Sequence, residues 1–573
     1  MSVPSQDDER EPARPWRQTN AGRVFLVAAG AVLLCALVMA IFPSQSDDLW
    51  MHLAVGRRYF REGHFPDPDP WIFSIPEYRR GWLDVWGAHL GAYGLYRLGG
   101  FPALVLTKAL LVVAGVAAPF WLARRLSYCG FAVPLLTLLA VWAGCPRFIE
   151  RASLVSDVGC AWVLAIVASE LVRPSRLRWA LPCLFVVWTN IHTGVLTGMA
   201  MVSFAALSQP RRWRTWTPLL LACVAASCVH PNGFRTLLWS IQSMLGGGFE
   251  VYRAFVAEFR PTLGPDKIGT YPVIVFLILA ALVVIPLVAS LRRGKLGGFG
   301  LLAFAALIYL GTSSIRFVTT AALSLPVLGV ALLADARLGA SDEGPPAHQR
   351  ASVGATLLAA AAALALALTV ATGGYDAPPF SGRRLGLGRD PAMDPVAAAE
   401  VVRALPLAGR IFNEHTFGAY LAWQWDGAPR IFYHGYVIDP VFYRQNFVDA
   451  MISPEAFDRV MNGHDIDVIL LSPRPATRTS GHAIYRTLMV RTDWHLIHWD
   501  RTSVVYLRER PAYESILKEQ AFRYVDPYRP EALEEGLRRD PARVREEAAR
   551  AARAWPDNEG LQQLAADLRA VPR

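Results

Sequence analysis

The chain has 573 residues, of which 53% are hydrophobic and only 18% are charged, and its mean hydropathy is +0.28. This composition excludes an ordinary soluble domain and favours a membrane protein. The net charge is +10, but the basic residues form short clusters between apolar runs, which orients a chain in a membrane and argues against a nucleic-acid partner. The seven cysteines include no CxxC pair, so neither a disulfide framework nor a zinc site is indicated.

The first two thirds of the chain contain apolar segments long enough for membrane helices. A polar tail, 1–23, precedes the first of them, and no cleavage site follows it, so we do not expect a cleavable signal peptide. Several segments are shorter than the ~20 residues of a full crossing. We predict about eleven transmembrane helices, at 24–42, 101–122, 131–145, 154–172, 179–190, 193–208, 217–229, 271–291, 297–314, 317–334 and 352–372.

The distribution of lysine and arginine predicts the orientation. With a cytoplasmic N-terminus, every second loop is basic, as positive-inside orientation requires. The exception is loop 43–100, whose arginines must have another task. An odd number of spans then places the C-terminal region outside the bacterial inner membrane. The inside clusters are Arg10, Arg14, Arg17 and Arg23; Arg124 and Arg125; Arg173, Arg176 and Arg178; Arg211, Arg212 and Arg214; Arg292, Arg293 and Lys295; and Arg337 with Arg350.

The predicted external face collects the polar residues that are unusual beside a membrane. They come from four loops and from one junction between two apolar runs. Ionisable groups there are costly and indicate function by default. They are Asp47, Asp48, His52, Asp67, Asp69, Glu77 and Asp84; Arg147, Glu150, Arg151 and Asp157; Asn190 and His192; His230, Asn232, Glu258, Arg260 and Lys267; and Arg316.

Simpler explanations exist for several of these residues. The acidic pair Asp47 and Asp48 also fits the solvated start of a helix, with Ser46 or Asp47 as N-cap. Asn190 and His192 also fit polar groups satisfied inside a helix bundle. The clustering of carboxylates and arginines nevertheless suits one chemistry, because a carboxylate can deprotonate a hydroxyl and an arginine can bind a departing phosphate. A lipid-linked sugar donor would meet both groups at a membrane surface.

The first external loop resembles a known motif. It contains "DLWMHLAVG" and then "GHFPDPDPWIFS", which is similar to D-x-W-x-H-L-x-x-G followed by G-x-x-P-x-x-D-P and a serine. This pattern is typical of bacterial integral-membrane glycosyltransferases of the C-type superfamily, which resemble the dolichyl-phosphate-mannose and undecaprenyl-phosphate-sugar enzymes. Three later stretches, "WTNIHTG", "HPNGF" and "AEF", are similar to elements of one branch of these proteins. They depart from it at Thr193, in the order of Pro231 and Asn232, and at Phe259.

The resemblance implies a reaction and a set of site residues. A sugar would move from a polyprenyl-phosphate donor to an acceptor hydroxyl at the extracytoplasmic face, with inversion. Asp48 matches the family's catalytic base, and Asp47 is the alternative. A divalent metal, Mg²⁺ or Mn²⁺, held by Asp48 and Glu258 is left open, and the acceptor is not identified. The donor-binding residues would be Arg316, Arg151, His52, Asn190 and His192, with Arg57 and Arg58 as weaker candidates.

The last third of the chain predicts a small extracytoplasmic α/β domain, 373–510, and a helical tail, 511–573, after a transmembrane domain, 24–372. We expect strands in "GRIF", "RIFYHGY" and "DIDVILLSP", and a closing hairpin that turns at Asp500–Thr502. Surface positions are expected for His415, Tyr433, His434 and Asp439, where they would face either solvent or the acceptor. The rival functions are a non-catalytic transporter or lipid-handling protein, and a scaffold. A transporter should show an internal repeat, and none is found.

Overall fold

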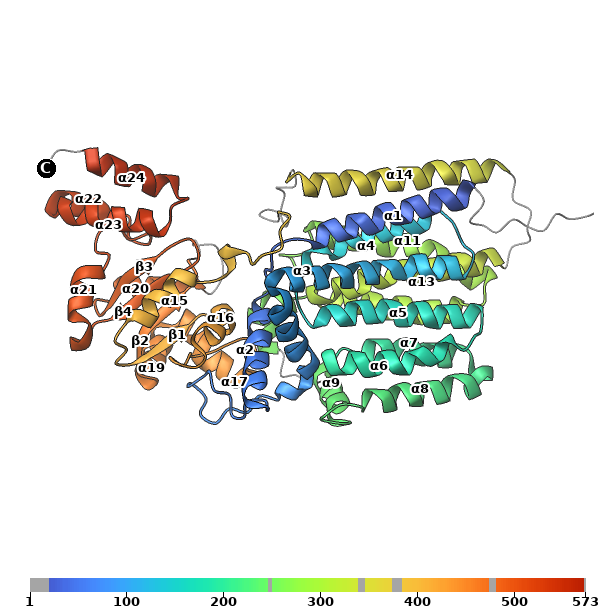
Figure 1. Ribbon diagram of the computed structural model, residues 1–573, viewed down its shortest axis with the longest axis horizontal. Helices are drawn as coiled ribbons and strands as arrows, with labels where there is room; N and C mark the ends of the chain where they lie inside the picture. Colours follow the sequence, from blue (N-terminus) through green and yellow to red (C-terminus); the bar gives the residue numbers. More distant parts are fainter. Residues whose placement is uncertain (1–19, 246–249, 339–345, 374–383, 474–480, 571–573) are drawn as a thin grey trace, which may run out of the picture. The chain divides into compact units, whose positions relative to one another are not determined.

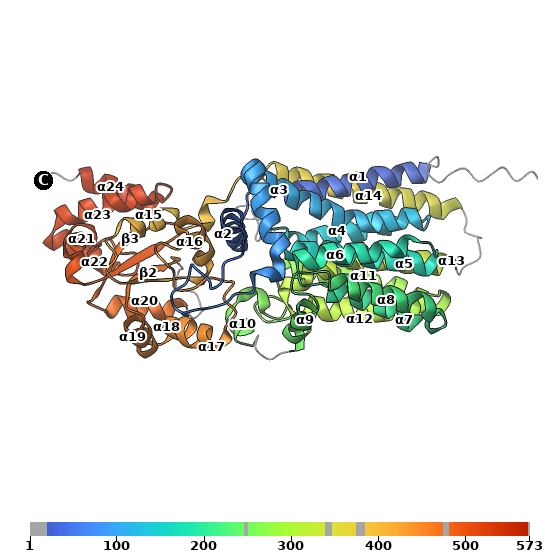
Figure 2. The ribbon, with the colours of Figure 1, turned by 60° about the horizontal axis from the view of Figure 1, so that its bottom comes forward.

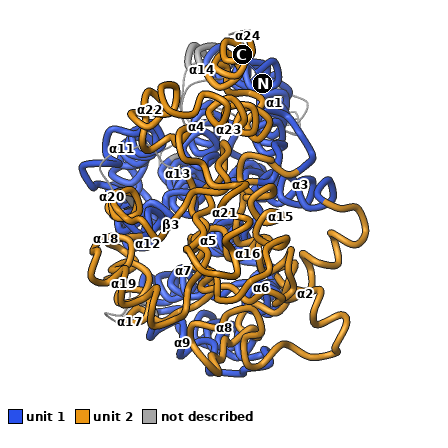
Figure 3. The backbone as a smooth tube through the Cα atoms, turned by 90° about the vertical axis from the view of Figure 1, so that its left-hand side faces the viewer, with its two compact units in different colours: residues 1–44, 101–246, 256–388 blue, residues 45–100, 247–255, 389–573 orange. Residues whose placement is uncertain are grey.

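The computed structural model describes residues 20–245, 250–338, 346–373, 384–473 and 481–570. The chain divides into two compact units, each assembled from segments distant in the sequence (Figure 3). Unit 1 comprises 1–44, 101–246 and 256–388, and unit 2 comprises 45–100, 247–255 and 389–573. Most of the expected cytoplasmic tail 1–23, including Arg10, Arg14 and Arg17, lies outside the described residues.

Unit 1 is a bundle of helices that run side by side (Figure 1). Each of the eleven predicted apolar segments lies in a helix of this unit. The helices are α1 (Asn20–Ala40), the second part of α3 (Trp86–Arg125), α4 (Ala132–Gly144), α5 (Ser153–Val172), α6 (Ala180–Ile191), α7 (Leu196–Ser208), α8 (Trp213–Ser227), α9 (Arg235–Leu245), α11 (Tyr271–Arg293), α12 (Gly297–Ser313), α13 (Val318–Leu338) and α14 (Pro346–Ala371).

The protein is a multi-pass membrane protein. Within the described ranges, six helices combine the length and the hydropathy needed for a crossing, and four shorter apolar helices accompany them. Helix α8 belongs to neither group. The fold is therefore helical and polytopic, as the sequence predicts, while the number of eleven crossings stays a prediction.

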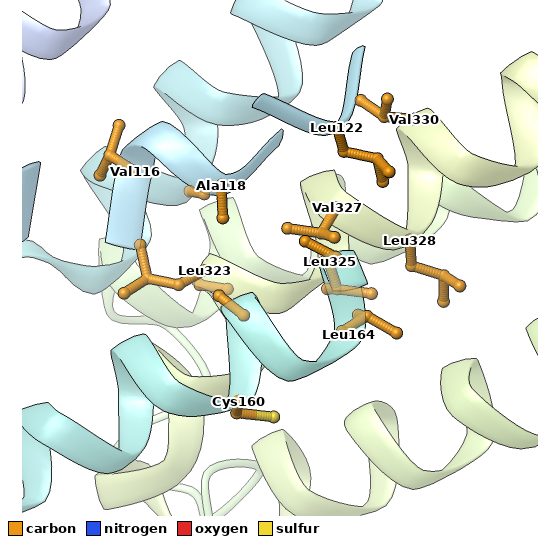
Figure 4. Packing of buried hydrophobic residues seen from close by; sticks show 14 of the residues in the cluster. Val116, Ala118, Leu122, Cys160, Leu164, Leu323, Leu325, Val327, Leu328 and Val330 are labelled. Carbon is orange, nitrogen blue, oxygen red and sulfur yellow. The ribbon is translucent and has the colours of Figure 1, made fainter. Parts of the chain in front are cut away.

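The core of unit 1 is centred on α13. The apolar window of this helix is 89% buried, compared with 33% for the window in α14. Figure 4 shows Leu323, Leu325 and Val327 of α13 close to Leu122 and Ala118 of α3 and Leu164 of α5. Because lipid replaces water outside the bundle, a fully buried helix must gain its stability from van der Waals packing against its neighbours.

Helix α3 contains a sharp break between two regular parts. Gly99 and Gly100 have non-helical backbone angles, and Gly100 has a φ of 61° and a ψ of −149°. Residues with a Cβ atom are excluded from this region, so a glycine is required at position 100. The boundary between the two units falls at this break.

Unit 2 contains a four-stranded sheet with helices on both sides, which agrees with the predicted small α/β domain. In Figure 2, α15 and α16 lie on one side of the sheet, and α18, α19 and α20 lie on the other. Its elements are α2 (Asp47–Glu62), α10 (Glu250–Phe255), α15 (Val396–Ala404), β1 (Arg410–Asn413), α16 (His415–Trp425), α17 (Pro440–Phe442), α18 (Asp449–Ile452), α19 (Pro454–Gly463), β2 (Ile466–Leu471), α20 (Gly481–Val490), β3 (Trp494–Trp499), β4 (Val504–Arg508) and α21 (Glu514–Gln520).

The strand order is β1-β2-β4-β3, with β1 parallel to β2 and the other pairs antiparallel. All six residues of β2 are buried, as expected of a continuous apolar run in a central strand. The β3–β4 hairpin turns where the sequence predicts it. Asp500 fixes this turn, since its Oδ1 accepts from the backbone N–H groups of Thr502 at 2.7 Å and Ser503 at 2.8 Å.

The prediction of a strand in "RIFYHGY" is wrong. In this segment only Ile431 forms a bridge, and its partner is Ile72 of the first loop. The reason lies in the side chain of Asn413. Its Oδ1 accepts from the N–H of Phe432 at 2.9 Å, and its Nδ2 donates to the carbonyl of Tyr433 at 2.8 Å. A buried side-chain amide thus satisfies backbone groups that a neighbouring strand would otherwise bind.

The tail is helical, as the sequence predicts. After α21 it contains α22 (Glu531–Arg539), α23 (Pro541–Ala554) and α24 (Glu559–Ala570). Glu547 of α23 is fully buried and accepts from the backbone N–H groups of 523–525 at 2.9–3.0 Å. These bonds join α23 to the segment that follows α21.

Candidate active site

The two candidate bases begin helix α2 of unit 2. Asp47 and Asp48 are its first two residues, both half-buried, and Ser46 precedes them without a side-chain capping bond. Carboxylates in the first turn of a helix interact favourably with the partial positive charge of that end. A carboxylate is also a group that serves as a general base.

His52 anchors α2 in the interior of unit 2. It is 3% exposed, its Nδ1 lies 3.0 Å from Nδ1 of His89, and its Nε2 lies 2.9 Å from the hydroxyl of Tyr436. A hydrogen bond between two ring nitrogens needs a proton on only one of them, so at least one of the two rings is neutral. Because Asp48 and His52 are four residues apart, they lie on the same side of α2, and the contacts of His52 also orient Asp48.

A second buried pair holds the loop that follows α2. Nε2 of His434 lies 3.0 Å from Oδ2 of Asp69, whose Oδ1 accepts from the N–H of Trp71 at 2.9 Å. His434 and Tyr433 are at most 1% exposed, so the expectation of a surface position is wrong for both residues. Asp439 caps α17 through the N–H of Phe442 at 2.9 Å.

Replacing Tyr436 by phenylalanine is expected to destabilise the full-length protein by about 1–2 kcal/mol, because a buried nitrogen of His52 loses its partner. The measurement is the thermal unfolding temperature in detergent. Tyr309→Phe is the matched control, since Tyr309 is 70% exposed on α12. Equal unfolding temperatures for wild type and Tyr436→Phe would contradict this role for the hydroxyl.

Unit 1 contains a cluster of three arginines around Glu258. Arg151 donates from Nη1 to Oε2 of Glu258, and Nη1 of Arg147 lies 3.5 Å from the same oxygen. Arg316 joins them, since its charge acts on Glu258 and its guanidinium lies 4.7 Å from the ring centroid of Phe259. The three arginines come from the α4–α5 connection and from the short turn before α13.

Two hydrogen bonds to backbone carbonyls join the Glu258 segment to the turn that carries Arg316. The hydroxyl of Ser314 donates to the carbonyl of Glu258 at 2.8 Å, and the N–H of Ile315 donates to the carbonyl of Arg260 at 3.1 Å. These bonds hold the turn of Arg316 beside Glu258 before any ligand arrives, which lowers the reorganisation that binding requires.

Charge in the cluster keeps Glu258 ionised. Burial by itself raises the pKa of the Glu258 carboxyl, but the charges of Arg151, Arg316 and Arg147 outweigh it, and the pKa falls below its ordinary value. Asp157 also interacts with Arg147 and Arg316. Two carboxylates do not neutralise three guanidinium groups, so the cluster retains positive charge. Arginine groups in this arrangement suit a phosphate.

Glu258→Gln is expected to reduce the amount by which the stability of the fold falls in acid. A carboxyl whose folded-state pKa is depressed stabilises the fold above its unfolded-state pKa, and that contribution is lost as the pH falls through the folded-state pKa. Wild type should therefore lose more stability than the variant as the pH falls below about 4.5, the ordinary pKa of glutamate. The measurement is the unfolding temperature from about pH 6 to about pH 3. Glu534→Gln, on the exposed side of α22, is the control, and parallel curves for wild type and Glu258→Gln would contradict the prediction.

Asn190 and His192 lie at the end of α6 and form hydrogen bonds with neighbouring residues. Nδ2 of Asn190 donates to the carbonyls of Val186 at 2.8 Å and Val229 at 2.7 Å. Nδ1 of His192 lies 2.6 Å from the hydroxyl of Ser156 and accepts from the N–H of Gly194 at 3.1 Å. Their role in donor binding stays a prediction.

No protein-family model matches the chain, and a search of curated proteins finds no match. Solved structures do match. The apo oligosaccharyltransferase of Archaeoglobus fulgidus is 10% identical with a TM-score of 0.50, and the match covers 87% of this chain and 75% of that one. The chain has the C-type glycosyltransferase fold.

Two further structures are similar at lower scores. ArnT from Cupriavidus metallidurans, bound to undecaprenyl phosphate, is 14% identical with a TM-score of 0.48, and the match covers 86% of this chain and 99% of that one. The arabinofuranosyltransferase AftD from Mycobacteria is 16% identical with a TM-score of 0.45, and the match covers 86% of this chain and 40% of that one. The match to the oligosaccharyltransferase confirms, for the fold alone, what the sequence resemblance implies.

Three of the residues described above were not singled out by the sequence. Arg147 was one polar residue among many in its loop, although its spacing of four from Arg151 indicates a shared side if the connection is helical. His89 and Tyr436 carried no local signal, because each acquires its role only through contact with His52, far away in the sequence.

A metal ion at Glu258 does not fit its surroundings. Oε2 of Glu258 is bound by Arg151 and lies close to Arg147, and these charges repel a cation. Among the described residues, no group of three or more histidine, cysteine, aspartate or glutamate side chains could hold a metal ion. The expectation that Asp48 and Glu258 hold a divalent metal stays a prediction.

Proposed function

We propose that the protein is a membrane glycosyltransferase that moves a sugar from a polyprenyl-phosphate donor to an acceptor hydroxyl at the extracytoplasmic face of the bacterial inner membrane. The C-type fold supports the general reaction. The observation that carries the proposal is the cluster of Arg147, Arg151 and Arg316, because its excess positive charge suits the phosphate of such a donor.

The proposed reaction is a single displacement. Asp48 accepts the proton of the acceptor hydroxyl, the acceptor oxygen bonds to the anomeric carbon, and the bond from that carbon to the phosphate oxygen breaks with inversion. The transition state carries positive charge on the sugar ring and negative charge on the departing phosphate. This negative charge is of the kind that guanidinium groups stabilise, and polyprenyl phosphate leaves.

The test uses membranes that contain the full-length protein and a panel of polyprenyl-phosphate sugars. The expected result is transfer of one sugar to a membrane or envelope acceptor, with release of an equal amount of polyprenyl phosphate. The rival transporter function predicts something different, namely movement of the lipid across a vesicle membrane with its phosphate–sugar bond intact. Movement without release from any donor would overturn the proposal.

A further inference from the structure

Unit 2 contains a cavity that the proposed reaction does not use. Its volume is about 530 Å³, within the range of small-molecule sites. Its walls come from the end of α2, from the first external loop and from two arginines near β1. Its lining contains Phe73 and two sets of charged side chains, the arginines Arg58, Arg410 and Arg430 and the carboxylates Glu62, Asp67, Asp69 and Glu77.

Backbone bonds hold the walls of this cavity in place. The N–H of Ile431 donates to the carbonyl of Trp71 at 2.8 Å, and the N–H of Phe73 donates to the carbonyl of Ile431 at 3.2 Å. The hydroxyl of Ser74 donates to the carbonyl of Phe432. The stretch "PDPDP" also lines the cavity, and each of its prolines fixes its own φ. The cavity is therefore formed before a ligand binds, which reduces the entropic cost of binding.

The charges of the lining are only partly paired. Arg58 is bound to Glu62 at 2.9 Å along α2, and Asp67 lies 3.5 Å from Arg79. By contrast, neither Arg410 nor Arg430 has a carboxylate partner in the part of the chain that the structure describes. The guanidinium of Arg410 lies 4.9 Å from the ring centroid of Phe73, so the cavity places a cationic hydrogen-bond donor next to an aromatic ring.

We propose that this cavity binds a saccharide that carries an acidic group and belongs to the acceptor. Arg410 and Arg430 offer N–H donors in the planar arrangement that matches a carboxylate or a phosphate. The carboxylates of Glu62 and Glu77 accept hydrogen bonds from sugar hydroxyls. The proline and phenylalanine surfaces pack against the C–H face of a sugar ring. A mixture of donors, acceptors and apolar surface is what a saccharide requires.

The position of Asp48 on the same helix connects this cavity with sugar transfer, and this step rests on the proposed function. Arg58 follows Asp48 by ten residues of continuous helix. At 1.5 Å per residue, the two positions lie about 15 Å apart along α2. A few linked sugar units span such a length. The acidic unit would thus be held at the end of α2 while a hydroxyl further along the glycan reaches Asp48.

The test is a binding titration on the full-length protein in detergent, with digalacturonate and the neutral disaccharide of the same linkage, galactobiose, as probes. Wild type should bind digalacturonate at least about tenfold more tightly than galactobiose, and the double variant Arg410→Gln/Arg430→Gln should bind it at least about tenfold more weakly than wild type does. Arg501→Gln is the matched control, because Arg501 is exposed in the β3–β4 turn outside the cavity lining. It should leave both affinities unchanged.

Three outcomes would overturn the inference. They are no binding of digalacturonate by wild type, equal affinity for the two disaccharides, and an equal loss of affinity in Arg501→Gln. The titration contains no sugar donor, so its failure does not count against the transfer reaction. Conversely, specific binding of digalacturonate without transfer from any donor would count against the proposed function and the acceptor role that rests on it, and would leave the saccharide site in place.

Discussion

Asp48→Asn is expected to slow sugar transfer by about a thousandfold while leaving donor binding unchanged. An amide has the size of the carboxylate but does not accept a proton at neutral pH, and a positioned general base contributes about 10²–10⁴ to a rate. The carboxylate lies in the first turn of α2. His52, on the same side of the helix, is fixed by His89 and Tyr436, so the loss should reflect chemistry more than movement of the helix.

The measurement compares initial rates of transfer and equilibrium binding of the donor for the wild-type and variant proteins. Asp47→Asn is the closest comparison, because the two aspartates are neighbours in the same helical turn. Asp557→Asn, exposed in the tail, controls for expression and handling. A large loss in Asp47→Asn with an active Asp48→Asn would transfer the base to Asp47. Unchanged rates in both variants would remove the proposed base.

The sequence predicts most helices of unit 1 and most strands of unit 2 because apolar pattern and burial are local signals. All eleven apolar segments overlap helices, and β1, β2 and the β3–β4 hairpin appear where expected, but α9 falls in a segment that the sequence predicts as a loop. The failure at "RIFYHGY" has a tertiary cause, since Asn413 binds the backbone of that segment. Alternating apolar residues indicate a strand, but they do not show whether a neighbouring strand or a side chain will take its hydrogen bonds.

The arginines of loop 43–100 illustrate the same limit. Positive-inside counting treats them as an exception, and unit 2 gives most of them partners. Arg61 binds Asp426 at 2.6 Å, and Arg80 binds Asp84 at 3.0 Å. Asp84 is near enough in the sequence for such a pair to be foreseen, whereas Asp426 lies more than three hundred residues away. Residue types predict which chemistry a chain can perform, but only the fold shows which charges are already paired.

Arg151→Gln is expected to lower kcat/KM for the lipid-linked donor by about a hundredfold, since one well-placed donor to a developing negative charge contributes about 10²–10³. Arg151 is only partly exposed and already binds Glu258, so its guanidinium is oriented before the donor arrives. Arg151→Lys keeps the charge but loses the planar arrangement of donors, and we expect an intermediate loss. The measurements are donor KM, kcat and binding of polyprenyl phosphate.

Two further variants separate phosphate binding from the simple neutralisation of Glu258. Arg260→Gln is the matched control, because Arg260 is in the same loop as Glu258 but pairs at 3.0 Å with Asp266. The side chain of Asp266 is 45% exposed, and exposed ion pairs contribute little to stability. The decisive variant is Arg151→Gln/Glu258→Gln. If Arg151 only neutralised Glu258, removing both charges would restore transfer. A phosphate-binding arginine predicts that the double variant stays as slow as Arg151→Gln, because the donor still lacks its partner when the carboxylate is gone.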